Sequence, residues 1–428
     1  MNLPSPNHAI SEWVDETQRA VLDKDFDSII HEFQENYIGK LSYQPIYQDV
    51  IRSRSFFSSS AYFGYRLGKN MLTLCPTNLS KNYDLYFTDS NGVLKTNIQQ
   101  RLSALDQALQ AKSKKIPVIA FFGGSTMMGD GSRLPKFTIP AQVEKLLISK
   151  YGYQTCCINF GIAGTSSIDA INILDSDVIN QYQPDIVIFY DGWNCCTQYI
   201  FKTLVSESPK LNSKIKIYDR QSLFSIVHDN YISKSFECVW LLKYLLVVFT
   251  IKSLSSLIIF FNNKTLKKLI THWLQRLPVF YGKQAMYADI YNNLPTENDL
   301  QESLASRAAH SYVRIHEAAK KHCAIEAIQF LTFLQPLQNI GNKPLTETEI
   351  KNYELSPNSL ISSNMFRSFY NEIKKHVLIK PEYFDLTHCF DNSPEEIYID
   401  NGHINAYGNY LVADRISEVI NESKQASL

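Results

Sequence analysis

The chain has 428 residues, 45% of them hydrophobic, and its 42 lysines and arginines balance 42 aspartates and glutamates. It is long enough to bury a large core and exceeds one typical domain, although elaborated α/β domains reach this length through insertions. The first ten residues lack the basic and apolar segments of a secretory signal, and eight cysteines without such a signal do not indicate a disulfide framework. We therefore expect a cytoplasmic protein, with or without peripheral attachment to a membrane.

The first hundred residues combine helical and irregular signals. Apolar residues recur at helix-compatible spacing between residues 10 and 35, and the stretch that follows, to residue 97, is rich in Tyr, Phe, Ser and Asn. Asp89-Ser-Asn-Gly92 is a turn signal that joins residues 85–88 to residues 93–96, and it predicts a small hairpin. We expect residues 1–100 to form an N-terminal extension that packs on the core.

Strand-like and helix-like segments alternate after residue 100. Apolar, β-prone runs begin at Ile116, Thr155 and Pro184, and helical patterns separate them at residues 139–150 and 167–182. Farther along, a helical pattern at residues 298–322 precedes the apolar run 324–334, which we interpret as another central strand. This alternation is typical of a parallel sheet covered by helices.

The first of these runs leads directly into Gly123-Gly124-Ser125. Ligands of open α/β sheets bind beyond the carboxyl ends of buried parallel strands, so Ser125 is a candidate catalytic nucleophile. Tight turns and phosphate loops use the same small residues. However, Gly129-Asp130-Gly131-Ser132 has a carboxylate where a phosphate loop requires a lysine, which argues against nucleotide binding.

A histidine near the C-terminus has an acidic neighbour. Asp400 precedes His403 by three residues in a loop rich in Gly and Asn, and a helical pattern follows it. This spacing allows the carboxylate to hold one imidazole nitrogen while the other nitrogen faces a serine hydroxyl, as a serine hydrolase requires. The alternative is a loop histidine beside a surface aspartate.

Two further segments offer donors for an oxyanion, which must be stabilised by groups placed beforehand. The strand-like run 155–160 leads to Gly161-Ile-Ala-Gly164, and the run 184–190 leads to Asp191-Gly-Trp-Asn194. The first segment offers a backbone amide, and the second offers a side-chain amide.

Taken together, these four segments resemble the SGNH (GDSL-like) hydrolase family, which is named for a Ser, a Gly, an Asn and a His in four separate blocks in this order. The resemblance implies a three-layer α/β/α fold with a parallel, flavodoxin-like five-stranded central sheet, and it implies ester hydrolysis. It implies Ser125 as the nucleophile, His403 and Asp400 as its triad partners, and Ser125, Gly164 and Asn194 as the oxyanion hole. The expected substrates are carboxylic esters, such as acylated sugars, short acyl esters or lipids.

Two positions depart from the family pattern. Gly124 stands where an aspartate commonly precedes the serine, and Cys195 stands where an aspartate commonly follows the asparagine, which affects how Asn194 is oriented. Two alternatives to hydrolysis remain. One is acyl transfer from the same serine to an acceptor hydroxyl, and the other is a non-catalytic binding protein built on a hydrolase fold.

Other polar and thiol groups give weaker signals. Gln335 closes the run 324–334 at the predicted active-site edge and could contact substrate, although a polar residue that ends a strand before a proline also explains it. Cys156-Cys157 and Cys195-Cys196 are adjacent pairs, whereas zinc motifs separate their cysteines by two to four residues. We expect no metal and no other cofactor.

Residues 200–283 form a basic, apolar insertion between two parts of the core, 101–199 and 284–428. The insertion holds 13 lysines and arginines against four acids, and its segment 236–261 is almost entirely apolar apart from Lys243 and Lys252. Those lysines interrupt a transmembrane span and lie on opposite sides of a single helix. We expect two shorter helices that cap the active site or attach to an anionic membrane surface. The aliphatic density argues against nucleic-acid binding.

Overall fold

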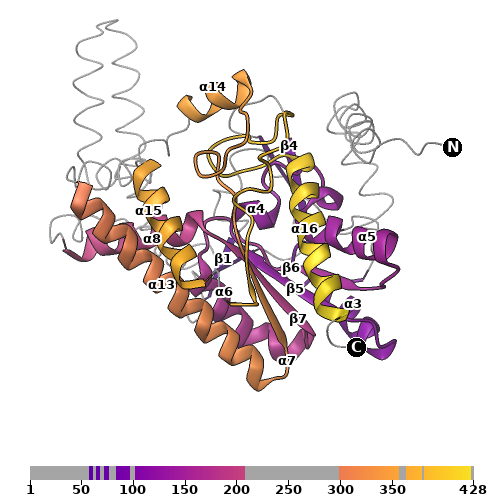
Figure 1. Ribbon diagram of the computed structural model, residues 1–428. Coiled ribbons are helices and arrows are strands. Elements are labelled where there is room, and N and C mark those ends of the chain that lie inside the picture. Colours follow the sequence, from indigo (N-terminus) through magenta and orange to yellow (C-terminus); the bar gives the residue numbers. More distant parts are fainter. Residues whose placement is uncertain are drawn as a thin grey trace, which may run out of the picture. The chain divides into compact units, whose positions relative to one another are not determined.

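The computed structural model describes residues 57–60, 64–67, 72–76, 83–96, 102–207, 298–355, 363–377 and 380–425 (Figure 1). The chain divides into two compact units, one made of residues 1–199 and 298–428 and the other of residues 200–297. The helix expected at residues 10–35 and the insertion beyond residue 207 lie outside the described residues. The four-part division of the chain, and the choice between a cap and a membrane-attached insertion, therefore stay predictions.

A five-stranded parallel sheet forms the centre of the first unit. Its strands lie in the order β6-β5-β7-β8-β9, and every neighbouring pair is parallel. Numbered along the chain this order is 2-1-3-4-5, which is the flavodoxin-like arrangement. The predicted sheet is therefore confirmed. Its strands are β5 (Val118–Gly123), β6 (Cys156–Asn159), β7 (Ile186–Asp191), β8 (Gln329–Leu334) and β9 (Tyr383–Asp385).

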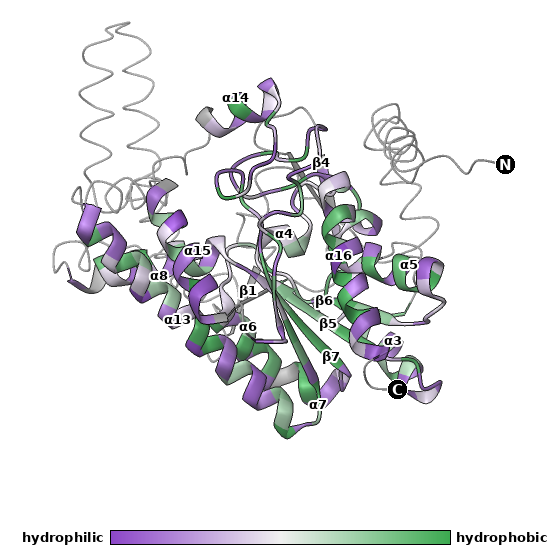
Figure 2. Ribbon diagram, viewed as in Figure 1, coloured by the Kyte–Doolittle hydropathy of each residue, from purple (hydrophilic) through white to green (hydrophobic). Residues whose placement is uncertain are grey.

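The strands are hydrophobic on both faces because helices cover both. On β5, Val118, Ala120 and Phe122 belong to one buried cluster, whereas Ile119 and Phe121 belong to the other. This alternation follows from the period of two in a strand. Figure 2 shows the strands as hydrophobic, whereas the surrounding helices carry both hydrophobic and hydrophilic residues. The predicted three-layer α/β/α class is confirmed.

Helices of the first layer contribute small and aliphatic side chains to the cluster around Val118. They are α3 (Ala104–Ser113), α6 (Ser167–Ile173), α7 (Ile179–Tyr182) and α13 (Asn298–Ile325). A π-helical segment at Leu174–Val178 joins α6 to α7. On the opposite face lie α5 (Ile139–Tyr151) and α16 (Ala406–Gln425), which appear together on the right of Figure 1.

The remaining elements surround this core. Two antiparallel pairs precede it, β1 (Phe57–Ser60) with β2 (Gly64–Leu67) and β3 (Leu72–Pro76) with β4 (Tyr83–Phe87). Short helices α4 (Ser125–Met128) and the 3-10 turn Pro135–Phe137 follow β5, and α8 (Trp193–Glu207) follows β7. Between β8 and β9 lie α14 (Glu347–Leu355) and α15 (Ser363–Val377), and α15 packs on α13.

Local sequence signals set several element ends. Ser166 and Asp169 form a capping box at the start of α6, so two of the free amides at that end are satisfied. On the opposite face of the sheet, Gly152 adopts a left-handed conformation with φ of 72° at the C-terminal end of α5 and closes that helix.

Two expected elements differ from the structure. The run 324–334 does not begin as a strand, because α13 continues to Ile325 and Ala327 turns the chain with φ of 56°. Only Gln329–Leu334 joins the sheet. The predicted hairpin across Asp89–Gly92 reduces to a single bridge between Thr88 and Leu94, since β4 forms its ladder with β3.

None of the helices in the described ranges is long and apolar enough to cross a bilayer. A cytoplasmic location and peripheral attachment to a membrane remain predictions.

Candidate active site

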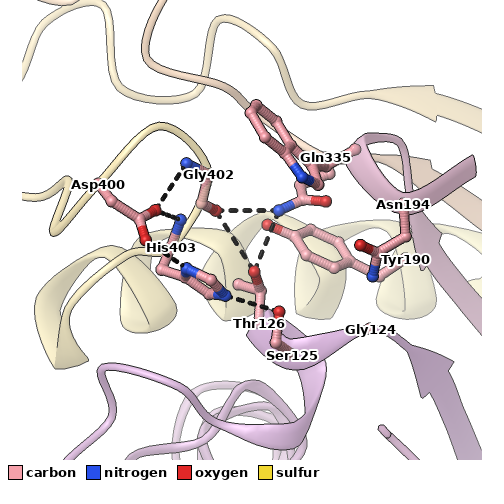
Figure 3. A pocket seen from close by; sticks show the side chains of 10 residues that line it. Gly124, Ser125, Thr126, Tyr190, Asn194, Gln335, Asp400, Gly402 and His403 are labelled. Carbon is pink, nitrogen blue, oxygen red and sulfur yellow. Dashed lines mark hydrogen bonds and ion pairs between the residues drawn. The ribbon is translucent and has the colours of Figure 1, made fainter. Parts of the chain in front are cut away.

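Ser125 lies at the carboxyl end of β5, at the first position of α4 (Figure 3). The two glycines before it are required by close packing. A Cβ on Gly123 would lie 2.6 Å from the carbonyl oxygen of Tyr190, and a Cβ on Gly124 would lie 2.1 Å from Nδ2 of Asn194. Both distances are shorter than real Cβ contacts, so a larger residue at position 123 would meet backbone, and one at position 124 would displace the side-chain amide of Asn194.

Ser125, His403 and Asp400 form a hydrogen-bonded line. The Oγ of Ser125 is 2.6 Å from Nε2 of His403, and Nδ1 of His403 is 2.7 Å from Oδ2 of Asp400. The other carboxylate oxygen of Asp400 accepts hydrogen bonds from the backbone amides of Gly402 and His403, at 3.0 and 2.8 Å. The three-residue spacing between acid and histidine therefore produces a closed loop that aims the imidazole at the serine.

The charges of this pair stabilise one another. Burial alone would lower the pKa of His403, but attraction to Asp400, followed by Asp130 and Asp84, raises it to about 9. Burial would likewise raise the pKa of Asp400, but the charge of His403 and the hydrogen bonds that the carboxylate accepts lower it to about 2. Opposite charges and donors to the carboxylate favour the ionised forms of both groups.

Asn194 lies in the first turn of α8, and Gly164 lies on the loop between β6 and α6. Asn194 lines the same pocket as Ser125, and its amide nitrogen lies against Gly124. Gly164 has φ of 75°, is exposed, and accepts a hydrogen bond on its carbonyl oxygen from the side chain of Gln198, which is on α8. This hydrogen bond joins the loop that carries Gly164 to α8, the helix that carries Asn194.

Cys195 does not compete with Asn194 for the pocket. Its side chain is buried, and its Sγ lies 2.9 Å from Oγ of Ser167 and 3.4 Å from the amide nitrogen of Ser167. Successive residues of a helix point in directions about 100° apart. The thiol therefore faces the interior while Asn194 faces Gly124.

Gln335 joins the loop of His403 to the helix of Ser125. Its side-chain amide donates to Oγ1 of Thr126 at 3.0 Å and to the carbonyl oxygen of Gly402 at 2.9 Å, and Thr126 donates to the same carbonyl at 3.3 Å. The hydroxyl of Tyr370 holds the backbone carbonyl of Gln335 at 2.9 Å. Gln335 lines the pocket, and its side-chain donors are used within the protein.

Ser125, His403 and Asp400 line a pocket that is partly open to solvent. Trp193 lines one side and stacks on Phe366 of α15, with ring centroids 4.4 Å apart. Tyr190 also lines the pocket, and its buried hydroxyl has no hydrogen-bond partner among the described residues. Thr126, Trp193 and Tyr190 could not be predicted as pocket residues from the sequence, because aromatic and hydroxyl residues at strand ends carry no distinctive spacing.

Two carboxylates from outside the predicted blocks approach this site, and the sequence analysis missed their role. Asp130 Oδ2 is 3.5 Å from Nε2 of His403. Asp84, on β4, accepts hydrogen bonds from the amides of Gly131 and Arg133 at 2.8 Å each. Burial raises the pKa of Asp84 to about 6, and the negative charge of Asp130 acts in the same direction.

A second set of Ser, His and Asp side chains lies in the interior. Oγ of Ser167 is 2.8 Å from Oδ2 of Asp191 and 2.7 Å from Nε2 of His316, and Nδ1 of His316 is 2.8 Å from Oγ1 of Thr332. Ser167 and His316 have no exposed surface. Here the serine stands between the acid and the histidine, whereas a catalytic triad places the histidine between the other two. We interpret this set as structural.

Two other groups of residues have ligand chemistry. His310, Glu372 and His376 place their ligand atoms within 4.8 Å of one another, and they form the candidate metal cluster within the described ranges. None of them lines the pocket. Cys156 and Cys157 belong to opposite faces of the sheet, so they cannot bind one ion together.

No protein-family model matches the sequence, and no curated protein sequence matches it either. The fold is similar to solved structures of lipases and esterases. A lipase from a goat rumen metagenome is 12% identical, with 71% of this chain and 97% of that chain covered and a TM-score of 0.36. A protein assigned to the G-D-S-L lipolytic family from Desulfitobacterium hafniense is 11% identical, with coverage of 71% and 98% and a TM-score of 0.32.

An acetyl xylan esterase variant from Geobacillus stearothermophilus is 15% identical, with 72% of this chain and 96% of that chain covered and a TM-score of 0.30. At these identities and TM-scores the likenesses assign no activity to this chain.

Proposed function

We propose that this chain is an SGNH-type serine hydrolase that cleaves carboxylic esters. One geometric observation supports this activity above all. Within a pocket, Ser125 Oγ lies 2.6 Å from an imidazole nitrogen of His403, whose other nitrogen lies 2.7 Å from Asp400. A serine hydroxyl in contact with a base that is itself oriented by a carboxylate is the arrangement that nucleophilic acyl transfer requires.

The proposed reaction begins when His403 Nε2 accepts the proton of Ser125 Oγ as this oxygen attacks the ester carbonyl. The carbonyl oxygen becomes an oxyanion, which the amides of Ser125 and Gly164 and the side-chain amide of Asn194 would bind. The imidazolium then gives its proton to the departing alcohol, and an acyl-serine remains. Water, deprotonated by His403, releases the acid and restores the serine. Asp400 orients the ring and stabilises its charged form throughout.

The close approach of Asn194 to Gly124 supports its part in this scheme. An oxyanion formed beside Ser125 needs donors that are already in place. Because Gly124 has no side chain, the amide of Asn194 can lie directly beside the turn that carries the nucleophile. The departure from the family pattern at position 124 is therefore compatible with the proposed oxyanion hole.

Replacement of Ser125 tests the proposal. We expect Ser125→Ala to lower kcat by about 10⁴-fold or more on p-nitrophenyl esters from acetate to decanoate. The matched control is Ser417→Ala, which removes a buried hydroxyl that donates to the carbonyl oxygen of Ala413 within α16 and should retain turnover per folded molecule. A fluorophosphonate probe should label Ser125 in the wild type and in the control. Unchanged esterase activity in Ser125→Ala would overturn the assignment.

The same preparation separates the two alternatives. A non-catalytic binding protein predicts no labelling of Ser125 in folded protein. An acyltransferase predicts labelling, but little release of acid until an acceptor alcohol is added. A hydrolase predicts that product acid accumulates at the same rate as p-nitrophenol in water alone.

A further inference from the structure

The loop that follows Ser125 carries a carboxylate that approaches the reacting side of His403. Asp130 Oδ2 lies 3.5 Å from Nε2, the nitrogen that also contacts Ser125, whereas Asp400 binds the opposite nitrogen, Nδ1. The backbone amide of Asp130 donates to the carbonyl oxygen of Ser125 at 3.0 Å. The imidazole therefore lies between two carboxylates, one at each nitrogen.

Strand β4 holds this loop through two buried side chains. The hydroxyl of Tyr86, which is 2% exposed, donates to Oδ1 of Asp130 at 2.5 Å. Asp84 lies two residues earlier on the same face of the strand and accepts the amides of Gly131 and Arg133. Asp130, Gly131 and Arg133 of this loop are thus tied to β4.

The same loop presses against the segment that carries His403. Gly131 has φ of 91°, and a Cβ there would lie 2.2 Å from Cδ1 of Ile399 and 2.4 Å from the carbonyl oxygen of Ile404. Only glycine allows this approach at this conformation. The separation between Asp130 and His403 is therefore fixed by packing on both sides of the loop.

We propose that Asp130, held by Tyr86, is a second carboxylate partner of His403 that stabilises positive charge at Nε2 and sets the pH range in which Ser125 is activated. This inference rests on the proposed function, because it concerns the base of the same reaction. It makes the N-terminal strand β4 part of the catalytic apparatus, through the hydroxyl of Tyr86.

Charged groups from three segments affect the pKa of His403. Asp400 faces it from its own loop, Asp130 from the loop after α4, and Asp84 from β4, while the guanidinium of Arg133 faces Asp84 and opposes their charge. Burial lowers the pKa of His403, and the carboxylates raise it to about 9.

This charge has two opposite consequences for the reaction. A general base must be neutral before it can accept a proton, so a carboxylate beside Nε2 confines activity to higher pH. The same carboxylate stabilises the imidazolium that forms as Ser125 attacks, and so it raises the rate once the ring is neutral. Removing the charge of Asp130 should therefore raise the reaction rate at low pH and lower it at high pH.

The experiment measures fluorophosphonate labelling of Ser125, together with kcat/KM for p-nitrophenyl acetate, from pH 5 to pH 10. We expect Asp130→Asn to move the acid limb of both profiles downward by about one pH unit, the order expected for a unit charge about 4 Å away in a partly solvated setting. At high pH the plateau of Asp130→Asn should lie several-fold below that of the wild type, so in each measurement the profile of the variant crosses that of the wild type. Asp130→Glu, which keeps the charge, should stay closer to the wild type.

Asp414→Asn is the control, because it removes one negative charge from an aspartate that pairs with Lys150 on the surface. It should leave both profiles unchanged. If Asp130→Asn does not fold, Asp130→Ser replaces it with the same expectation. An acid limb that is the same in folded Asp130→Asn or Asp130→Ser and in the wild type would overturn this inference, whereas absence of labelling in the wild type at every pH would overturn the proposed function instead.

Discussion

The open site and the buried site use the same three residue types in different orders. At the pocket, His403 stands between Ser125 and Asp400, and its side chain is 27% exposed. In the interior, Ser167 stands between Asp191 and His316, and no solvent reaches it. A hydroxyl that a base can activate and a substrate can reach occurs only in the first arrangement. The order in which the three side chains contact one another, and their exposure to solvent, therefore separate a candidate catalytic set from a structural set with the same residue types.

The buried set also supports the open one. Asp191 ends β7 just before α8, which carries Asn194, and Ser167 begins the helix that follows the loop of Gly164. Their hydrogen bond of 2.8 Å therefore joins the two predicted oxyanion loops beneath the pocket. We interpret the interior set as a structural contact that holds the Gly164 loop against the end of β7 that leads to Asn194.

A large loss of turnover should follow from disturbing the open site without removing any of its polar groups. Gly124→Ala places a Cβ 2.1 Å from Nδ2 of Asn194, so this amide must move away. We expect kcat on p-nitrophenyl acetate to fall by about 10² to 10³, as for loss of one oxyanion donor.

Gly152→Ala is the matched control for Gly124→Ala. Its added Cβ would meet no atom within 4 Å, although φ is 72° there. The control should lose about 1 kcal/mol of unfolding free energy and no turnover. Wild-type kcat in Gly124→Ala would show that Asn194 is not a donor.

The buried site should respond in stability rather than in turnover. His316 contacts Ser167 and Thr332 by hydrogen bonds and lies against the ring of Tyr312, with centroids 4.0 Å apart. His316→Ala leaves a cavity and removes the hydrogen bonds that His316 makes with Ser167 and Thr332, so we expect a loss of about 2 to 3 kcal/mol in urea unfolding.

Turnover per folded molecule of His316→Ala should stay within about ten-fold of the wild type. The comparison between the two sites breaks if the folded variant loses activity by about 10³-fold or more. The interior histidine would then belong to the catalytic set.

Much of this arrangement could be predicted from the sequence because it depends on local patterns. The continuous apolar run before Ser125 predicts a strand buried on both faces, and the spacing between Asp400 and His403 predicts their contact. The resemblance to the SGNH family adds the order of the blocks and the five-stranded sheet. Strand β9 was not located, because three residues carry no periodicity.

The remainder depends on packing between distant parts of the chain. Tyr86 and Asp130 are 44 residues apart, and Ser167 and His316 are 149 apart. Nothing in their local sequence indicates that they meet. In the sequence, His316 is one polar residue of an amphipathic helical pattern, and its role is apparent only from its burial in the structure.

The smallest effect that we expect is a pH dependence of stability at the open site. The folded pKa of His403, about 9, lies above its ordinary value of 6.5. Its pairing therefore contributes stability that is fully present below about pH 6.5 and is lost as pH rises through 9. We expect the wild type to lose about 1 to 2 kcal/mol of unfolding free energy across this window relative to His403→Gln.

Stability and activity should therefore change in opposite directions over the same pH range, because the charged imidazole stabilises the fold whereas the neutral imidazole activates Ser125. Urea unfolding of both proteins at pH 6.5, 7.5, 8.5 and 9.5 measures the first trend, and labelling of Ser125 at the same pH values measures the second. A free-energy difference between wild type and His403→Gln that does not change with pH would mean that His403 titrates near its ordinary pKa. The carboxylates around it would then contribute little to either property.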